Sequence, residues 1–226
     1  MDKKISIAID GPSGAGKSTL ARMTAKSLGF IYVDTGALYR SVGLFALRHG
    51  TDAGDRAAVT ALLPGITLEL DYDEKGVQRV FLCGEDVTDA IRTPEVSLAA
   101  SAVSAIPEVR AFLLETQRDM ARRHDVAMDG RDIGTVVLPD ADVKIFLTAS
   151  PEERARRRYR ELRAKGTGAP YKEVLRDLLV RDRNDSSRDI APLRPAEDAI
   201  LLDTTGNSLR KSFGQIRSIV REKLGK

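Results

Sequence analysis

A segment of eight residues near the start of the chain, GPSGAGKS at positions 11–18, constrains the fold more than any other feature of the sequence. It satisfies the pattern G-x-x-x-x-G-K-[ST], in which glycines let the backbone curl so that successive N–H groups face an anion. The isoleucine-rich residues 5–9 before it predict a strand, and residues 17–28 after it predict a helix that ends at Gly29. A loop of this kind between a strand and a helix predicts a phosphate-binding site at the helix N-terminus.

The rest of the chain predicts an α/β fold. A second strand at residues 30–33 is followed by a helix at 37–49, so the chain begins β-α-β-α. Further strands are expected at residues 126–129, 143–147 and 200–203. These five strands predict a three-layer P-loop fold, in which a parallel sheet carries helices on both faces and ligands lie outside the carboxyl ends of the strands.

A different pattern interrupts this alternation. Residues 66–72 and 77–83 predict two antiparallel strands joined by a hairpin turn, which we interpret as an insertion. Prolines at positions 94 and 107 then predict the starts of two helices, because proline is tolerated in the first helical turn. The second of these helices is expected to reach about residue 123.

Two further helices are expected between residues 150 and 185. A capping box at residues 150–153 begins an arginine-rich helix. Glycines and a proline interrupt it at residues 165–170, and a further helix is expected at 171–185. The chain of 226 residues is therefore interpreted as one domain with a small insertion.

Composition excludes several classes of protein. A single cysteine, Cys83, and two histidines predict neither an intrachain disulfide nor a typical zinc site. The single cysteine favours a reducing, cytoplasmic location. No apolar run approaches the roughly 20 residues that span a bilayer, so we expect no membrane span and no membrane partner. The chain has 36 Lys and Arg residues against 33 Asp and Glu residues, so its formal net charge is only +3. Positive charge is concentrated at residues 154–194, as in a nucleic-acid surface, a polyphosphate site or a solvated helix face.

The phosphate-binding loop predicts the chemistry of two side chains. Lys17 is expected to reach the β- and γ-phosphates of a nucleotide, and the Ser18 hydroxyl to ligate Mg²⁺. The loop alone does not distinguish kinases from switch GTPases or motor ATPases, since all use it. Residues 203–206 match the D-x-x-G pattern of GTPases, but no N-K-x-D motif occurs, so we interpret them as a turn after a strand.

Arginines outside the loop favour a kinase. Phosphoryl transfer to a second phosphate brings two polyanions together, and guanidinium groups offset their repulsion while keeping their charge when water is excluded. The expected arginine-rich helix carries Arg154, Arg156, Arg157, Arg158, Arg160 and Arg163. For each of these, an ion pair on a solvated helix face is an equally reasonable interpretation.

Two further groups of polar residues suggest a substrate site. Arg181, Asp185 and Arg188 are spaced i, i+4 and i+7, which predicts either an ion-pair ladder or a site for a sugar hydroxyl beside a phosphate. The segment DGRDIGT at 129–135 follows a buried strand. An aspartate, an arginine and two glycines contribute little to packing there, so we favour a functional interpretation.

Four segments together resemble one family. They are IDGPSGAGK at 9–17, DTGALYR at 34–40, GRDIGTVV at 130–137 and the stretch from 181 to 193. On these segments, nearly the whole chain resembles the bacterial cytidylate kinases, a family of nucleoside monophosphate kinases. The second and third segments distinguish it from adenylate and thymidylate kinases. The resemblance implies a monophosphate-binding insertion at about residues 63–97 and a short helical lid at about 154–168.

The resemblance also implies which residues bind the substrates. The donor nucleotide would be held by Gly11, Pro12, Ser13, Gly14, Ala15, Gly16, Lys17, Ser18 and Thr19. The phosphate of CMP or dCMP would be held by Arg40 and Arg131, with Tyr39 and Arg188 close by. The cytosine would be read by Ser101, Arg110 and Asp132, and the sugar by Arg181 and Asp185, with Thr35 beside it. We expect Lys17, Arg131, Arg158 and Arg188 to act in catalysis.

Two positions depart from some members of that family. Thr35 stands in place of a serine and adds a methyl group near the sugar, which bears on the preference for deoxyribose. Ser18 stands in place of a glycine, so direct ligation of Mg²⁺ by residue 18 need not be general to the family.

These features predict an ATP-dependent kinase that converts CMP and dCMP to their diphosphates, with Mg²⁺ as cofactor, as a monomer with no nucleic-acid partner. An exocyclic amino group beside ring acceptors calls for a carboxylate and for donors such as arginine and serine, which Asp132, Arg110 and Ser101 would supply. One alternative is a kinase for another monophosphate such as UMP. A second is an RNA-binding or nucleotide-switch protein that uses residues 154–163, although Tyr159 is their only aromatic residue.

Overall fold

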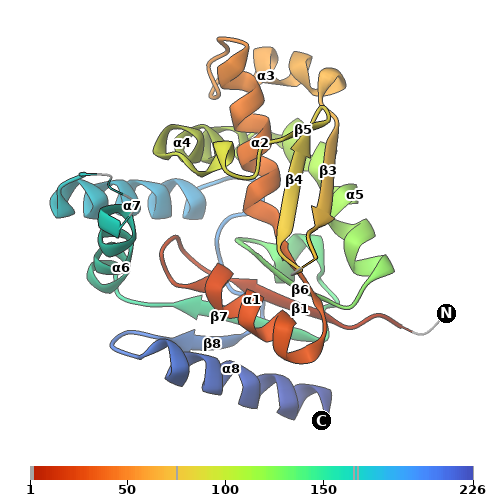
Figure 1. Ribbon diagram of the computed structural model, residues 1–226, viewed down its shortest axis with the longest axis vertical. Helices are drawn as coiled ribbons and strands as arrows, with labels where there is room; N and C mark the ends of the chain where they lie inside the picture. Colours follow the sequence, from red (N-terminus) through yellow and green to blue (C-terminus); the bar gives the residue numbers. More distant parts are fainter. Residues whose placement is uncertain (1–2, 75, 165, 167, 226) are drawn as a thin grey trace.

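The computed structural model describes residues 3–74, 76–164, 166 and 168–225. At its centre is a five-stranded sheet with the strand order β2-β6-β1-β7-β8 (Figure 1). The strands are β1 (Ser6–Asp10), β2 (Ile31–Asp34), β6 (Val126–Gly130), β7 (Val143–Thr148) and β8 (Ile200–Asp203). Every neighbouring pair is parallel, so all carboxyl ends lie at one edge. The five expected strands are confirmed, with ends within a residue or two.

Helices cover both faces of this sheet, which confirms the three-layer α/β architecture. Ile7 and Ile9 of β1 pack against α1 (Lys17–Leu28) and α8 (Leu209–Leu224) on one face. Ala8 points to the opposite face, where α5 (Pro107–Arg123) and the single π-helical turn η3 (Ile133–Val137) pack. This alternation buries both faces, as a parallel sheet requires. The sequence did not predict α8 or the π-helical form of η3.

The insertion forms a small antiparallel sheet. Its strands are β3 (Leu68–Tyr72), β4 (Gln78–Leu82) and the short β5 (Glu85–Asp86). The expected hairpin is confirmed, although residue 75 in its turn lies outside the described residues. β5 and the helix α3 (Arg56–Leu62) were not predicted. Two short 3-10 turns, η1 (Leu63–Gly65) and η2 (Ala90–Arg92), complete this region.

The insertion shares its hydrophobic core with neighbouring helices. Val80 and Leu82 of β4 pack in one cluster with residues of α2 (Thr35–Arg48), α4 (Pro94–Val103) and α5. In Figure 1 these elements stand together above the central sheet. The packing unit is therefore wider than the expected boundaries at residues 63 and 97.

A pair of helices forms the remaining wall. α6 (Pro151–Ala164) and α7 (Tyr171–Ser186) pack through residues such as Ala155 and Leu178, and lie at the left in Figure 1. The expected lid at about 154–168 begins inside α6, and residues 165 and 167 lie outside the described residues. α7 ends at Ser186, so Arg188 lies beyond the helix and the expected i+7 position on its face is wrong.

Within the described ranges, no single helix is long and apolar enough to cross a membrane. The bent pair α4 and α5, at 101° to each other, meets the criterion jointly by length and composition.

Candidate active site

One cavity of about 640 Å³ opens at the carboxyl edge of the central sheet. Its walls come from the phosphate-binding loop and α1, from α2 and α4, from the segment after β6, and from α6 and α7. The expected residues that line it are Ser13, Gly14, Ala15, Gly16, Lys17, Ser18, Thr19, Thr35, Tyr39, Arg40, Ser101, Arg110, Arg131, Asp132, Arg158, Arg181, Asp185 and Arg188. Gly11 and Pro12 belong to the loop but are not part of the cavity wall.

The backbone of the loop leaves an anion site at the start of α1. Gly11 has φ 144°, and a Cβ atom there would lie 1.9 Å from the carbonyl oxygen of Leu147, so only glycine fits. Gly16 precedes the helix with φ 93° and provides no side-chain cap. The first N–H groups of α1 therefore lack a side-chain acceptor, and the helix dipole favours negative charge at this point.

Lys17 lies in this anion site with little access to water. It is 5% exposed, and its Nζ donates a hydrogen bond to the carbonyl oxygen of Pro12 at 2.8 Å. Burial, and after it the nearby Arg131 guanidinium, lower the pKa of Lys17 to about 7. A bound phosphate would supply the negative charge that this ammonium group lacks and raise its pKa again.

A carboxylate and a hydroxyl lie side by side next to the loop. Ser18 Oγ donates to Asp129 Oδ2 at 3.0 Å, and the hydroxyl of Tyr32 donates to Asp129 Oδ1 at 2.8 Å. Burial, and then the charge of Asp34, raise the pKa of Asp129. Magnesium prefers oxygen ligands such as carboxylate and hydroxyl, so the donor set fits this metal. The sequence placed Asp129 in a functional segment but did not pair it with Ser18, because the two meet only through the pairing of β1 with β6.

In the same cavity, Asp185 lies between two arginines. Arg131 Nε donates to Asp185 Oδ2 at 2.8 Å, and Arg188 Nη2 donates to Asp185 Oδ1 at 2.6 Å. Burial acts to raise the pKa of Asp185, but the charges of Arg131 and Arg188 hold this pKa below its usual value. Asp185 thus fixes both guanidinium groups in place before any anion binds.

Three further arginines, from α7, α2 and η2, add positive charge to the cavity. Burial, and then Arg131, lower the pKa of Arg181 to about 10, and its buried Nε atom has no hydrogen-bond partner among the described residues. Arg40 pairs with Asp34 at 2.7 Å, but its buried Nε likewise has no such partner. Arg92, which the sequence analysis missed, lines the same cavity and approaches Asp34 to 3.3 Å. This surplus suits an anionic ligand.

A polar pocket between α4 and α5 completes the cavity. Arg110 and Asp132 form a buried ion pair, and Arg110 Nη1 donates to the carbonyl oxygen of Ser104 at 3.1 Å. The ring of Tyr39 lies 5.5 Å from the Arg110 guanidinium carbon, within the range of a cation–π contact. Ser101 lines the same pocket. Thr35 lies nearby and already donates its hydroxyl to the carbonyl oxygen of Asp129 at 2.8 Å.

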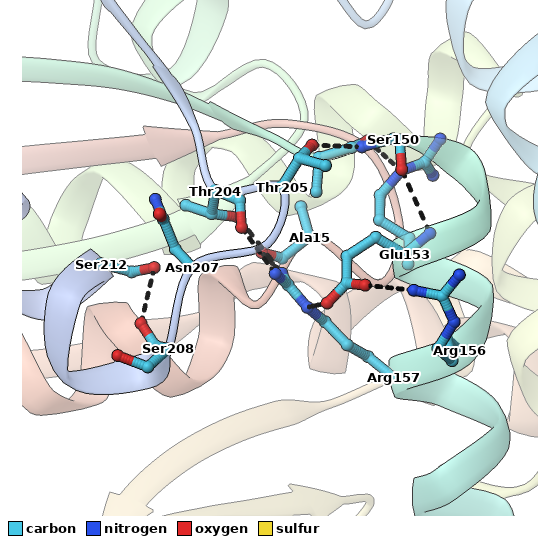
Figure 2. A network of polar contacts seen from close by, with 12 residues as sticks. Ala15, Ser150, Glu153, Arg156, Arg157, Thr204, Thr205, Asn207, Ser208 and Ser212 are labelled. Atoms are coloured by element: carbon cyan, nitrogen blue, oxygen red, sulfur yellow. Dashed lines mark hydrogen bonds and ion pairs between the residues drawn. The ribbon is translucent and has the colours of Figure 1, made fainter.

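The arginines of α6 divide into two groups. Arg157 donates to the carbonyl oxygens of Ala15 (3.3 Å) and Thr204 (2.8 Å) and also contacts Glu153, as Figure 2 shows. Arg154 is 4% exposed and donates to the carbonyl oxygen of Ser13 at 2.9 Å. Arg154 and Arg157 therefore hold the phosphate-binding loop itself.

Arg158 lines the cavity, as Arg157 also does. The ion-pair partner of Arg158 is Glu161 at 2.9 Å, and no hydrogen bond to the phosphate-binding loop is found for it among the described residues. The contacts of Arg157 include Thr204 in the segment at residues 203–206, whose interpretation as a turn after β8 is confirmed. This turn thus helps to hold Arg157 in place.

The fold and the cavity define a P-loop kinase, with one anion site at the start of α1 and a second, arginine-rich site facing it. The family model for cytidylate kinase matches residues 7–222. A cytidylate kinase of Carboxydothermus hydrogenoformans is 51% identical over 217 residues, covering 96% of this chain and 97% of the relative. One of Pelotomaculum thermopropionicum is 53% identical over 205 residues, covering 91% of each. The chain belongs to the cytidylate kinase family.

A solved structure supports the fold alone. The crystal structure of an uncharacterized protein from Eubacterium ventriosum aligns with a TM-score of 0.51 at 11% sequence identity, covering 95% of this chain and 97% of that one.

Proposed function

We propose that this protein transfers the γ-phosphoryl group of ATP to CMP and dCMP, giving ADP with CDP or dCDP. The observation that carries the proposal is the single cavity in which the phosphate-binding loop faces Arg131, Arg188 and the Arg110–Asp132 pair. A cavity complete within one chain supports a monomer. We place the protein in the cytoplasm, in pyrimidine nucleotide metabolism.

The donor side acts through charge and position. The N–H groups at the start of α1 and the ammonium group of Lys17 would bind the β- and γ-phosphates. Ser18 and Asp129 would hold Mg²⁺, which when bound neutralises charge on these phosphates. Arg158 faces the same space and would meet the transferred phosphoryl group.

The acceptor side fixes the nucleophile. Arg40, Arg131 and Arg188 would bind the monophosphate, so that one of its oxygens attacks the γ-phosphorus while the bond to the β–γ bridging oxygen breaks and ADP leaves. The attacking phosphate is already an anion, so no general base is required. Arg181 and Asp185 would bind the sugar, with Thr35 and Tyr39 beside it.

The base pocket favours cytosine over uracil. The Asp132 carboxylate would accept a hydrogen bond from the exocyclic amino group, while Arg110 and Ser101 would donate to the ring acceptors. Uracil presents a carbonyl oxygen where cytosine has its amino group, which leaves Asp132 facing an acceptor. Phosphorylation of UMP is therefore the weaker candidate. The RNA-binding alternative is weaker still, because Arg154 and Arg157 already donate hydrogen bonds to the phosphate-binding loop.

A panel of acceptors tests the proposal. Coupled ADP production is measured with MgATP and CMP, dCMP, UMP or AMP, and we expect kcat/KM for CMP to exceed that for UMP by at least about 10²-fold. Asp132→Asn should lower kcat/KM for CMP and reduce the ratio of kcat/KM for CMP to that for UMP. The reason is that an amide can donate to the uracil carbonyl as well as accept from the cytosine amino group. Equal use of UMP by the unaltered protein would remove the cytosine assignment.

The position of Arg154 predicts a defect that is larger on the donor side than on the acceptor side. Arg154→Ala removes the hydrogen bond to Ser13 and the 2.6 Å ion pair with Asp182 of α7, so the loop loses one support. We expect KM for ATP to rise about tenfold, while KM for CMP changes less than about threefold. Steady-state kinetics with each substrate varied in turn measures both values. Arg156→Ala is the matched control, since Arg156 lies on the same helix, is exposed and pairs with Glu153.

A further inference from the structure

Asp10, the last residue of β1, joins the two sides of the cavity. Its backbone leads directly into Gly11 of the phosphate-binding loop. Its side chain crosses to the neighbouring segment, where Oδ1 accepts the N–H of Ile133 and Oδ2 accepts the N–H of Gly134, both at 2.8 Å. One carboxylate is thus used entirely to hold the start of η3.

η3 follows the two residues expected to touch the acceptor. Arg131 and Asp132 immediately precede Ile133, so the position of the turn sets the position of both. Asp132 stands at the N-cap of η3, where an aspartate commonly accepts a hydrogen bond from the first N–H groups of the turn. Its side chain makes no such bond. Because Asp10 accepts the N–H groups of Ile133 and Gly134, the carboxylate of Asp132 is left to pair with Arg110 and face the cavity.

The surroundings of Asp10 favour a functional role. The side chain is 5% exposed and makes no ion pair within the part of the chain that the structure describes. Burial raises the pKa of Asp10 to about 6, so the charged form is held at a cost in free energy, which the two backbone N–H groups only partly offset. A neutral cap at this position would avoid that cost.

We propose that Asp10 is a positioning residue, which holds Arg131 and Asp132 at a fixed place relative to the phosphate-binding loop so that the acceptor lies in line with the donor. The inference rests on the proposed function. Asp10 touches neither the donor nor the acceptor, and acts through the backbone of η3.

The test replaces Asp10 by asparagine, which keeps the volume but turns an NH₂ group toward one of the two N–H donors. We expect Asp10→Asn to raise KM for CMP at least about tenfold and to lower kcat, while KM for ATP changes less than about threefold. Asp10→Ser, which keeps one acceptor oxygen, should give the same pattern. Steady-state kinetics with each substrate varied, together with thermal unfolding of each variant, provides the readout.

The matched control is Asp125, which precedes β6 and bonds to the chain at the opposite end of β1 from Asp10. Asp125 Oδ1 accepts the N–H of Ile5 at 2.7 Å, far from the cavity lining, so Asp125→Asn makes the same chemical change and should leave both KM values unaltered. An equal rise in both KM values, a loss of kcat alone, or failure of both Asp10 variants to fold would overturn the proposal. An unaltered protein that does not use CMP would instead refute the proposed function.

Discussion

Lys17→Ala is expected to lower the rate of phosphoryl transfer from ATP by at least about 10³-fold, the scale on which cations at a transferred phosphoryl group act. Lys17 is almost completely buried in the anion site, and no water can replace its charge at that position. Coupled ADP production with saturating CMP measures the loss. Lys17→Met, which keeps the aliphatic length of the side chain, should be equally inactive if the charge is what matters.

The control for this prediction lies on the same helix. Lys26 is in the last turn of α1 and is exposed, so Lys26→Ala should retain full turnover. Turnover of Lys17→Ala within tenfold of the unaltered protein would show that the loop backbone alone holds the donor, and would remove Lys17 from the catalytic residues.

Arg131→Ala and Arg188→Ala are each expected to lower kcat by about 10²- to 10³-fold while the fold is retained. Both guanidinium groups lie at the cavity wall on either side of Asp185, where they can offset the charge that spreads over the phosphoryl group during transfer. Arg131→Lys keeps a charge but loses the planar fork, so it should recover only part of the rate. Turnover and thermal unfolding are measured for each variant.

Arg183→Ala is the matched control for these substitutions, because Arg183 is an exposed arginine of α7 outside the cavity lining. The double variant Arg131→Ala/Arg188→Ala should lose less than the product of the single losses, since the two arginines share Asp185 and act as a unit. A kcat close to normal in either single variant would exclude that arginine from the site.

The parts of the fold that follow from local sequence were predicted closely. α1 has the expected bounds because a glycine fixes each of its ends, at Gly16 and Gly29. The five parallel strands follow from short apolar runs, which are buried on both faces in β1, β2 and β6. α3 and β5 were missed because they are short and depend on the shared core with α2, α4 and α5.

Contacts between distant segments set the limit for the site. The sequence and the family resemblance together predicted one site that contains Lys17, Arg131, Asp132 and Asp185. In the structure these four residues line one cavity. The roles of the α6 arginines did not follow, because whether an arginine reaches Ser13 or faces the cavity depends on how α6 packs beside the loop. The same holds for Asp10, whose partners lie more than 120 residues away along the chain.

The carboxylates that accompany the arginines have a consequence for turnover. Asp185 holds Arg131 and Arg188, and Asp34 holds Arg40, so part of the positive charge is already compensated when the cavity is empty. Such internal counterions weaken the attraction for a resting monophosphate while leaving the guanidinium groups correctly oriented for the charge that develops during transfer. In the proposed reaction, the diphosphate product would therefore dissociate more readily from this pocket.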